Sequence, residues 1–198
     1  MRGSASKIIA VDVAVVPPEW VQRRARAINV LLDGPPDGFR FDETHMPHVS
    51  LAQLFTARAS LPLFVGVLDL ILRGRARFDL RVLAAVRKDG NVSYLLDRTP
   101  ELWTLHEDLM NGCKEWEELE GTAEAFYSEG EPPRDRDVDW VANYRADASY
   151  RKFIPHITLG FGAAPPPGEP FDFTADRIAL FYLGRFCTCR LPLHEWTL

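Results

Sequence analysis

One sequence pattern constrains this chain more than any other, because it occurs twice at widely separated places. Residues 46–52 read MPHVSLA and residues 154–160 read IPHITLG. Both segments run apolar, proline, histidine, β-branched, hydroxyl, leucine and then a very small residue. The agreement extends to the flanking positions, which indicates that the two segments form equivalent structures.

Each segment predicts a half-buried strand with two polar side chains on one face. Side chains i and i+2 of an extended strand point to the same side. His48 and Ser50 are therefore expected on one face of the first strand, and His156 and Thr158 on one face of the second. The residues between them point the other way, into a core.

The same alternation makes predictions for the residues that follow each motif. Ala52 and Gly160 continue the parity of the histidines. We expect them on the polar side, where a bulky side chain would crowd a ligand. Phe55 and Phe161 have the opposite parity, and we expect them to pack in the core.

Hydrophobic periodicity and turn residues predict the elements around the two motifs. Helices are predicted over residues 19–32, 60–72 and 99–119, the second of them apolar nearly all round and therefore well buried. Strands are predicted over residues 7–16, 46–55, 78–87, 92–96, 150–161, 171–173, 177–183 and 185–196. This order indicates an α+β fold with largely antiparallel sheets.

Two segments carry no clear periodicity. Residues 121–150 are rich in charges and contain Glu-Pro-Pro, and a loop of this length often acts as a lid or a mobile segment. Residues 163–170 form a proline-rich connector.

Composition excludes several classes of protein. The chain has 198 residues, 46% hydrophobic and 26% charged, which is ordinary for a globular protein. A net charge of −5 argues against a surface that grips long nucleic acid, although a small phosphodiester can still bind in a local pocket. The three cysteines have no zinc spacing and suit a reducing compartment. Without a membrane-length apolar run or a signal peptide, we expect a cytoplasmic protein and no membrane partner.

The duplicated motif resembles the two-histidine (2H) phosphoesterase superfamily, which includes the bacterial 2'-5' RNA ligases, better described as RNA 2',3'-cyclic phosphodiesterases. The resemblance implies one bilobal domain over residues 1–198, pseudo-two-fold, with antiparallel sheets flanked by helices and a central cleft. It implies that His48 and His156 are catalytic and that Ser50 and Thr158 bind phosphate. Ala52-Gln53 and Gly160-Phe161 follow the motifs where some relatives have a basic residue near the phosphate, which leaves the source of any further phosphate-binding cation open.

Two histidines suffice for the chemistry that this resemblance implies. Histidine has an unperturbed pKa of ~6.5, so it can act as base or acid near neutrality. One imidazole could deprotonate water while the other protonates the departing ribose oxygen, without metal or cofactor. The hydroxyls could donate to the non-bridging phosphate oxygens. The expected substrate is a small phosphodiester or an RNA terminus, and the sequence does not assign acid and base.

Three other interpretations stay open at this point. The chain could be a nucleotide- or RNA-end-binding module with little or no hydrolysis. It could be a metal-dependent hydrolase in which His45, His48 and His156 bind the ion. Ser50 or Thr158 could be a nucleophile, although no nucleophile-elbow sequence surrounds either residue.

Weaker candidates lie outside the motifs. Tyr150 and Lys152 precede His156 at even offsets, so they could bind substrate if that strand begins early. Asp12 could orient a histidine or a ribose hydroxyl, or simply lie at a sheet edge. His106 and His194 are expected to be structural, as are Cys187 and Cys189, which would share one strand face.

Overall fold

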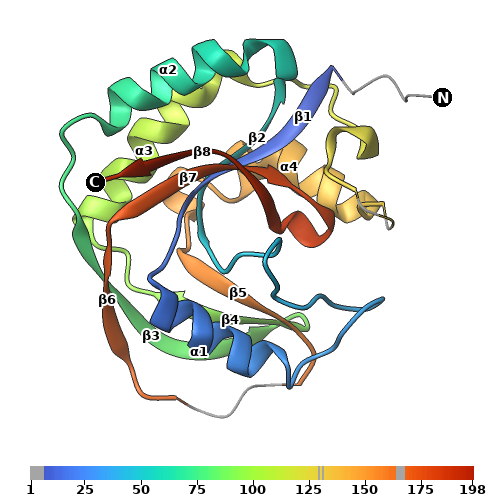
Figure 1. The fold of residues 1–198 in the computed structure, drawn as a ribbon, viewed down its shortest axis with the longest axis vertical. Coiled ribbons are helices and arrows are strands. Elements are labelled where there is room, and N and C mark those ends of the chain that lie inside the picture. The colour runs from blue at the N-terminus through green and yellow to red at the C-terminus, as the bar shows by residue number, and fades with distance from the viewer. Residues whose placement is uncertain (1–6, 129, 131, 164–167) are drawn as a thin grey trace.

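The strands form two antiparallel sheets of four strands each (Figure 1). The computed structural model describes residues 7–128, 130, 132–163 and 168–198, so half of the predicted connector 163–170 lies outside the described residues. Sheet A has the order β2–β1–β7–β8, and sheet B has the order β5–β4–β3–β6. Their bounds are β1 Ile8–Val15, β2 Val49–Ala57, β3 Phe78–Lys88, β4 Asn91–Leu96, β5 His156–Phe161, β6 Phe171–Ala175, β7 Arg177–Leu183 and β8 Cys189–Thr197.

The two motif strands occupy equivalent places in the two sheets. β2 is an outer strand of sheet A, and β5 is an outer strand of sheet B. Residues of β2 and β5 come into contact, so the two sheets meet along the motif strands. The chain passes from sheet B to sheet A between β6 and β7, with only Asp176 between these strands.

Four α-helices cover the sheets, namely α1 Glu19–Asn29, α2 Leu61–Leu72, α3 Pro100–Cys113 and α4 Asp135–Asp147. α3 begins as its sequence predicts, because the Thr99 side chain accepts a hydrogen bond from the backbone of Leu102 and Pro100 occupies the first turn. α1 lies against β5, whereas α3 and α4 both pack on β2. In Figure 1, α2 and α3 lie together at the upper left and α4 lies at the right.

The α+β architecture with antiparallel sheets is confirmed, but several local predictions are wrong. The segment 121–150, predicted as a loop, contains α4, whose Val141 and Tyr144 are buried. α3 ends at Cys113 instead of continuing to residue 119. α2 is not buried all round, because the side chains of Leu63 and Leu70 are 70% and 64% exposed.

The core has two parts that lie on opposite faces of sheet A. The larger cluster includes Val11 of β1, Val82 of β3 and Ile157 of β5, so it joins both sheets. The smaller cluster packs Ala10 and Ala14 of β1 against Val141 of α4 and other residues. Among the described residues, no helix has both the length and the apolar character to cross a membrane.

Candidate active site

Both motif strands carry a β-bulge at the same motif position. Ser50 pairs with Ala14 and Ala52 pairs with Val13, so Leu51 has no partner residue on β1. Thr158 pairs with Ser93 and Gly160 pairs with Val92, so Leu159 has none on β4. A bulge inserts one residue and reverses the alternation that follows it. The two motifs are therefore equivalent in backbone irregularity as well as in sequence.

The bulges change which residues share a face with the histidines. On β1, Asp12 and Ala14 point to the same side, and their partners Gln53 and Ser50 share that side. On β4, Asn91 and Ser93 share a side, as the hydrogen bond between their side chains confirms. Their partners on β5 are Phe161 and Thr158.

Of the predictions for the four residues after the motifs, those for Ala52, Gly160 and Phe161 need correction. Ala52 and Gly160 pair with Val13 and Val92, so they face the side away from the hydroxyls. Gln53 and Phe161 take their places on the site face. Phe55 does pack in a core, but in the cluster that α4 covers, and Phe161 is only partly buried.

The two histidines have the same internal hydrogen bond. Nδ1 of His48 lies 2.7 Å from the carbonyl of Met46, and Nδ1 of His156 lies 2.8 Å from the carbonyl of Ile154. A carbonyl only accepts, so Nδ1 must carry the proton, and Nε2 of each neutral ring has a free lone pair. Each motif therefore presents an unprotonated Nε2.

Burial keeps both imidazoles neutral. Burial, together with a smaller effect of the charge that His156 can carry, lowers the pKa of His48 from 6.5 to about 4. Burial also lowers the pKa of His156. The effect of one ring on the other means that the structure brings the two histidines within electrostatic range.

Asp12 lies on β1 next to the first motif and contacts its polar side chains. Its side chain is fully buried on β1, an inner strand of sheet A, so the alternative of a sheet-edge residue is wrong. Oδ2 accepts hydrogen bonds from Oγ of Ser50 at 2.5 Å and from Nε2 of Gln53 at 2.8 Å. The same oxygen lies 3.7 Å from Nε2 of His48. Burial raises the pKa of Asp12 from 3.8 to about 7, against the hydrogen bonds that lower it.

The hydroxyls of Ser50 and Thr158 therefore differ in their hydrogen-bond partners. Ser50 donates its only proton to Asp12 and accepts from Gln53 at 3.0 Å. Across the described part of the chain, the hydroxyl of Thr158 has no such partner and can rotate toward a ligand. Ser50 can donate to a phosphate only when Asp12 carries a proton of its own, which would reverse the bond between them.

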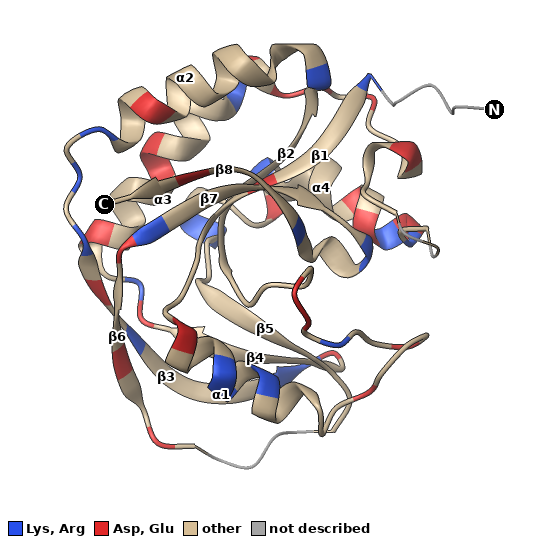
Figure 2. Cartoon of the chain, viewed as in Figure 1, with Lys and Arg blue, Asp and Glu red and all other residues tan. Residues whose placement is uncertain are grey.

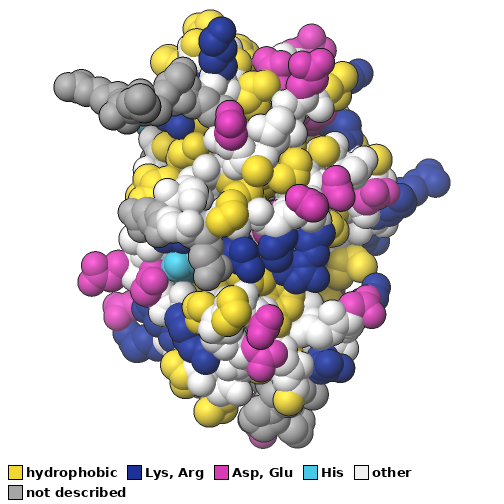
Figure 3. All heavy atoms as spheres, turned by 90° about the vertical axis from the view of Figure 1, so that its right-hand side faces the viewer, with side chains coloured by type: hydrophobic (Ala, Val, Ile, Leu, Met, Phe, Trp, Pro, Cys, Tyr) yellow, Lys and Arg dark blue, Asp and Glu magenta, His cyan; other side chains and the backbone are white. Residues whose placement is uncertain are grey.

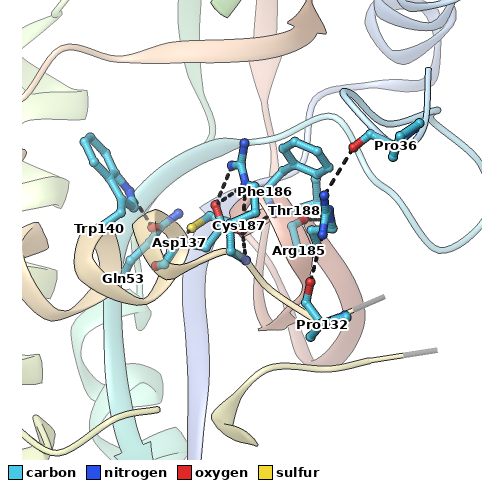
Figure 4. Close-up of polar contacts among 10 residues, drawn as sticks. Pro36, Gln53, Pro132, Asp137, Trp140, Arg185, Phe186, Cys187 and Thr188 are labelled. Carbon is cyan, nitrogen blue, oxygen red and sulfur yellow. Dashed lines mark hydrogen bonds and ion pairs between the residues drawn. The ribbon is translucent and has the colours of Figure 1, made fainter. Parts of the chain in front are cut away.

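α4 contacts this network directly. Nε1 of Trp140 donates to Oε1 of Gln53 at 2.9 Å, as Figure 4 shows. The amide of Gln53 is thereby fixed with its nitrogen toward Asp12 and Ser50.

One group in the described residues could hold a metal ion, and it differs from the three-histidine set considered above. Ligand atoms of Asp12, His48 and Cys189 lie within 4.8 Å of one another. However, Oδ2 of Asp12 already accepts two hydrogen bonds, and burial raises the pKa of Cys189 well above its usual value. In this arrangement two hydrogen bonds occupy Oδ2 of Asp12, and the thiol of Cys189 keeps its proton. His45 is not part of it and pairs with Asp42.

The structure places the weaker candidates in other roles. Tyr150 and Lys152 lie in a 3₁₀ turn, because β5 begins only at His156, and the early strand that would have aimed them at the site is absent. Nζ of Lys152 pairs with Asp147. The hydroxyl of Tyr150 donates to Asn111.

His106 braces both motifs from α3, as expected of a structural residue. Its Nδ1 lies 2.7 Å from the carbonyl of Leu51, the bulged residue of the first motif. Its Nε2 accepts from the backbone of Tyr150 at 2.8 Å, and its ring stacks on Phe153 just before the second motif. His194 lies partly exposed on β8, with Nε2 4.0 Å from Asp69. Cys187 lies in the turn before β8, so it does not share a strand face with Cys189.

The fold of this chain is similar to the folds of several solved structures. A structure of TT0787 from Thermus thermophilus matches with a TM-score of 0.59 and 18% identity, covering 96% of this chain and 98% of the other. Escherichia coli LigT complexed with NADP+ matches with a TM-score of 0.57 and 18% identity, covering 98% and 99%. LigT complexed with 3'-AMP gives 0.56 and 19%, covering 96% and 98%. A comparison with curated protein sequences gives no significant match.

Together, the two sheets and the repeated histidine motif define a phosphoesterase of the two-histidine class. The family model described as "2'-5' RNA ligase superfamily" matches residues 16–196. The chain therefore belongs to the 2'-5' RNA ligase superfamily.

Proposed function

We propose that this protein is a metal-independent phosphodiesterase that hydrolyses 2',3'-cyclic phosphate ends of RNA, or small cyclic or 2'-5'-linked nucleotides. The single observation that carries the proposal is the repeated arrangement of His48 and His156. Each ring is fixed by the carbonyl two residues before it and presents a free Nε2. Membership of the superfamily supports the same chemistry.

In this mechanism, the two imidazoles act on opposite sides of phosphorus. One neutral Nε2 takes a proton from the attacking water, and the other ring must be protonated to give a proton to the departing ribose oxygen. The anionic phosphodiester favours that protonation because it places negative charge beside the second ring. Such acid–base catalysis typically contributes ~10²–10⁴ in rate.

The hydroxyls would stabilise the transition state unequally. Thr158 can donate at once to a non-bridging oxygen, where negative charge collects. Ser50 can do so only after Asp12 has gained a proton. The approach of an anionic phosphate to His48, 3.7 Å from Asp12, favours that gain.

A second candidate is a nucleotide-binding module with little hydrolysis. It is favoured by the structures of LigT in complex with ATP, NADP+, 3'-AMP and phosphate. The two candidates differ in turnover, not in binding.

The test is turnover of nucleoside 2',3'-cyclic phosphates in the presence of EDTA. We expect hydrolysis by the wild-type protein and a loss of at least 10²-fold in kcat for His48→Ala and for His156→Ala. His194→Ala serves as the control, because this histidine lies on β8 and is exposed. Full activity of either motif variant would rule the mechanism out, and nucleotide binding without turnover would favour the second candidate.

A further inference from the structure

Arginine and phenylalanine side chains gather where α4 begins beside the end of β5. The ring centroid of Phe161 lies 5.1 Å from that of Phe186, in the turn between β7 and β8. The guanidinium of Arg134 lies 3.9 Å from the Phe186 centroid, and that of Arg136 lies 5.6 Å from the Phe161 centroid. We call the four residues Phe161, Phe186, Arg134 and Arg136 the arginine–phenylalanine cluster.

The cluster is on the face that carries the motif side chains. The bulge at Leu159 puts Phe161 on the same side as Thr158, three residues or roughly 10 Å along the strand. Phe186 is three residues before Cys189, whose Sγ lies 3.9 Å from Asp12 beside His48. A ligand that is bound at the motifs and extends along β5 would therefore contact the cluster.

The turn that presents Phe186 is strained and firmly held. Phe186 and Cys187 have φ values of 63° and 52°, a left-handed conformation that is costly for a bulky residue. Asp137, which is 2% exposed, accepts from the backbone of Phe186 at 3.0 Å and pairs with the guanidinium of Arg134. Arg185 bridges this turn to the carbonyls of Pro132 and Pro36 (Figure 4). Strain of this kind tends to be kept where it positions a functional side chain.

The charge of the cluster suits phosphate groups. Arg136 is exposed and, within the described ranges, makes no hydrogen bond or ion pair. Figure 2 shows basic positions at the start of α4 and in the β7–β8 connection. Figure 3 views the molecule from that side and shows a compact group of Lys and Arg side chains on a chain whose net charge is −5.

From this arrangement we infer that the arginine–phenylalanine cluster binds the nucleotides that precede the terminal phosphate of a single-stranded RNA. Aromatic faces and guanidinium planes stack on nucleobases, and arginine pairs with phosphate. The inference rests on the proposed function and narrows its substrate to an RNA end, since a free cyclic mononucleotide has no preceding nucleotide.

The experiment compares two substrates that share one reacting group. A tetraribonucleotide ending in a 2',3'-cyclic phosphate and the corresponding cyclic mononucleotide are assayed with wild type, Phe161→Ala and Arg136→Glu. We expect both variants to lower the ratio of kcat/KM values, oligonucleotide over mononucleotide, by about tenfold or more. A ratio equal to that of wild type would overturn the inference, as would equal losses on both substrates.

Two controls separate binding from folding and from charge. Arg73→Glu makes the same charge change on an exposed arginine after α2 and should leave the ratio unchanged. Glutamate in place of Arg136 lies in the first turn of α4, where negative charge stabilises a helix, so thermal unfolding should show no loss of stability.

If wild type hydrolyses neither substrate, the proposed function fails on its own. Fluorescence anisotropy with a 3'-phosphorylated tetraribonucleotide then tests the cluster. A tenfold weaker binding by Arg136→Glu would support it, and unchanged affinity would overturn it.

Discussion

Ser50 donates its hydroxyl proton to a carboxylate oxygen of the fully buried Asp12, at 2.5 Å. Thr158, which carries the equivalent hydroxyl of the second motif, is paired with Ser93 on β4 and not with an acid. The equivalence of the two motifs is therefore broken at one residue, because within the described residues a buried acid holds the hydroxyl of the first motif and not that of the second.

Replacing this acid should change how stability depends on pH. Burial raises the pKa of Asp12 to about 7, so the folded protein binds this proton more tightly than the unfolded chain. The stability that the proton contributes is fully present below pH 3.8 and is lost as the pH rises through 7, roughly 4 kcal/mol in all. Asp12→Asn cannot titrate, so its free energy of unfolding relative to wild type should rise between pH 4 and pH 7 in urea titrations. The exposed Asp139→Asn is the control, and parallel pH profiles for wild type and Asp12→Asn would contradict the prediction.

A second change tests the brace between the two motifs. Burial lowers the pKa of His106 from 6.5 to about 4, so its contribution to stability is present above pH 6.5 and is lost as the pH falls through 4. His106→Gln should lose ~1–3 kcal/mol at neutral pH, because one of its two backbone hydrogen bonds is broken. It should also lose less stability than wild type on acidification. Chemical unfolding at pH 7 and pH 5 measures both effects. His194 is partly exposed, so His194→Gln should be as stable as wild type and serves as the control. If His106→Gln were as stable as wild type at pH 7, His106 would not stabilise the two motifs.

The bulge in β5 requires a glycine at position 160. Gly160 has φ +144°, a conformation essentially reserved for glycine, and an added Cβ would lie 3.0 Å from Leu32 and 3.1 Å from Asn29. Gly160→Ala should therefore destabilise the protein by ~1–3 kcal/mol in urea titrations. Gly66 in α2 has nothing within 4 Å of an added Cβ, so Gly66→Ala should be neutral or stabilising by up to ~1 kcal/mol. Equal effects of the two substitutions would argue against the strain at Gly160.

Asp137 offers a test of the turn that presents Phe186. Asp137→Ala removes the acceptor for the Phe186 backbone and leaves the guanidinium of Arg134 without its partner. Breaking such a buried pair typically costs ~3–5 kcal/mol. Thermal or urea unfolding should show a loss of about 3 kcal/mol, with Asp139→Ala on the exposed side of α4 as the control. A loss below ~1 kcal/mol would mean that other contacts hold the turn.

Sequence reasoning reached the strands, the helix starts and the antiparallel sheets because these follow from periodicity and capping residues. Thr99-Pro100, which begins α3, is one example. The pairing of Asp12 with Ser50 could not be read in this way, because it depends on which strands become neighbours.

The bulges explain the largest error about the site. Nothing in the sequence around Leu51 or Leu159 marks a residue without a partner on the neighbouring strand, so simple alternation assigns Ala52, Gly160 and Phe161 to the wrong face. The only available sign was Gly160, a residue that tolerates positive φ. α4 was missed for a different reason. Its first turn is dense in charge, and its buried residues are few and widely spaced.

The placement of both motifs on outer strands of separate sheets has a consequence for substrate size. No ladder of backbone hydrogen bonds joins β2 to β5, so the separation of the two imidazoles depends on side-chain packing between the two sheets. A substitution that changes the volume of that packing can change this separation while every hydrogen bond within each sheet stays intact. Selectivity in such a molecule can be altered by hydrophobic residues that never touch the ligand.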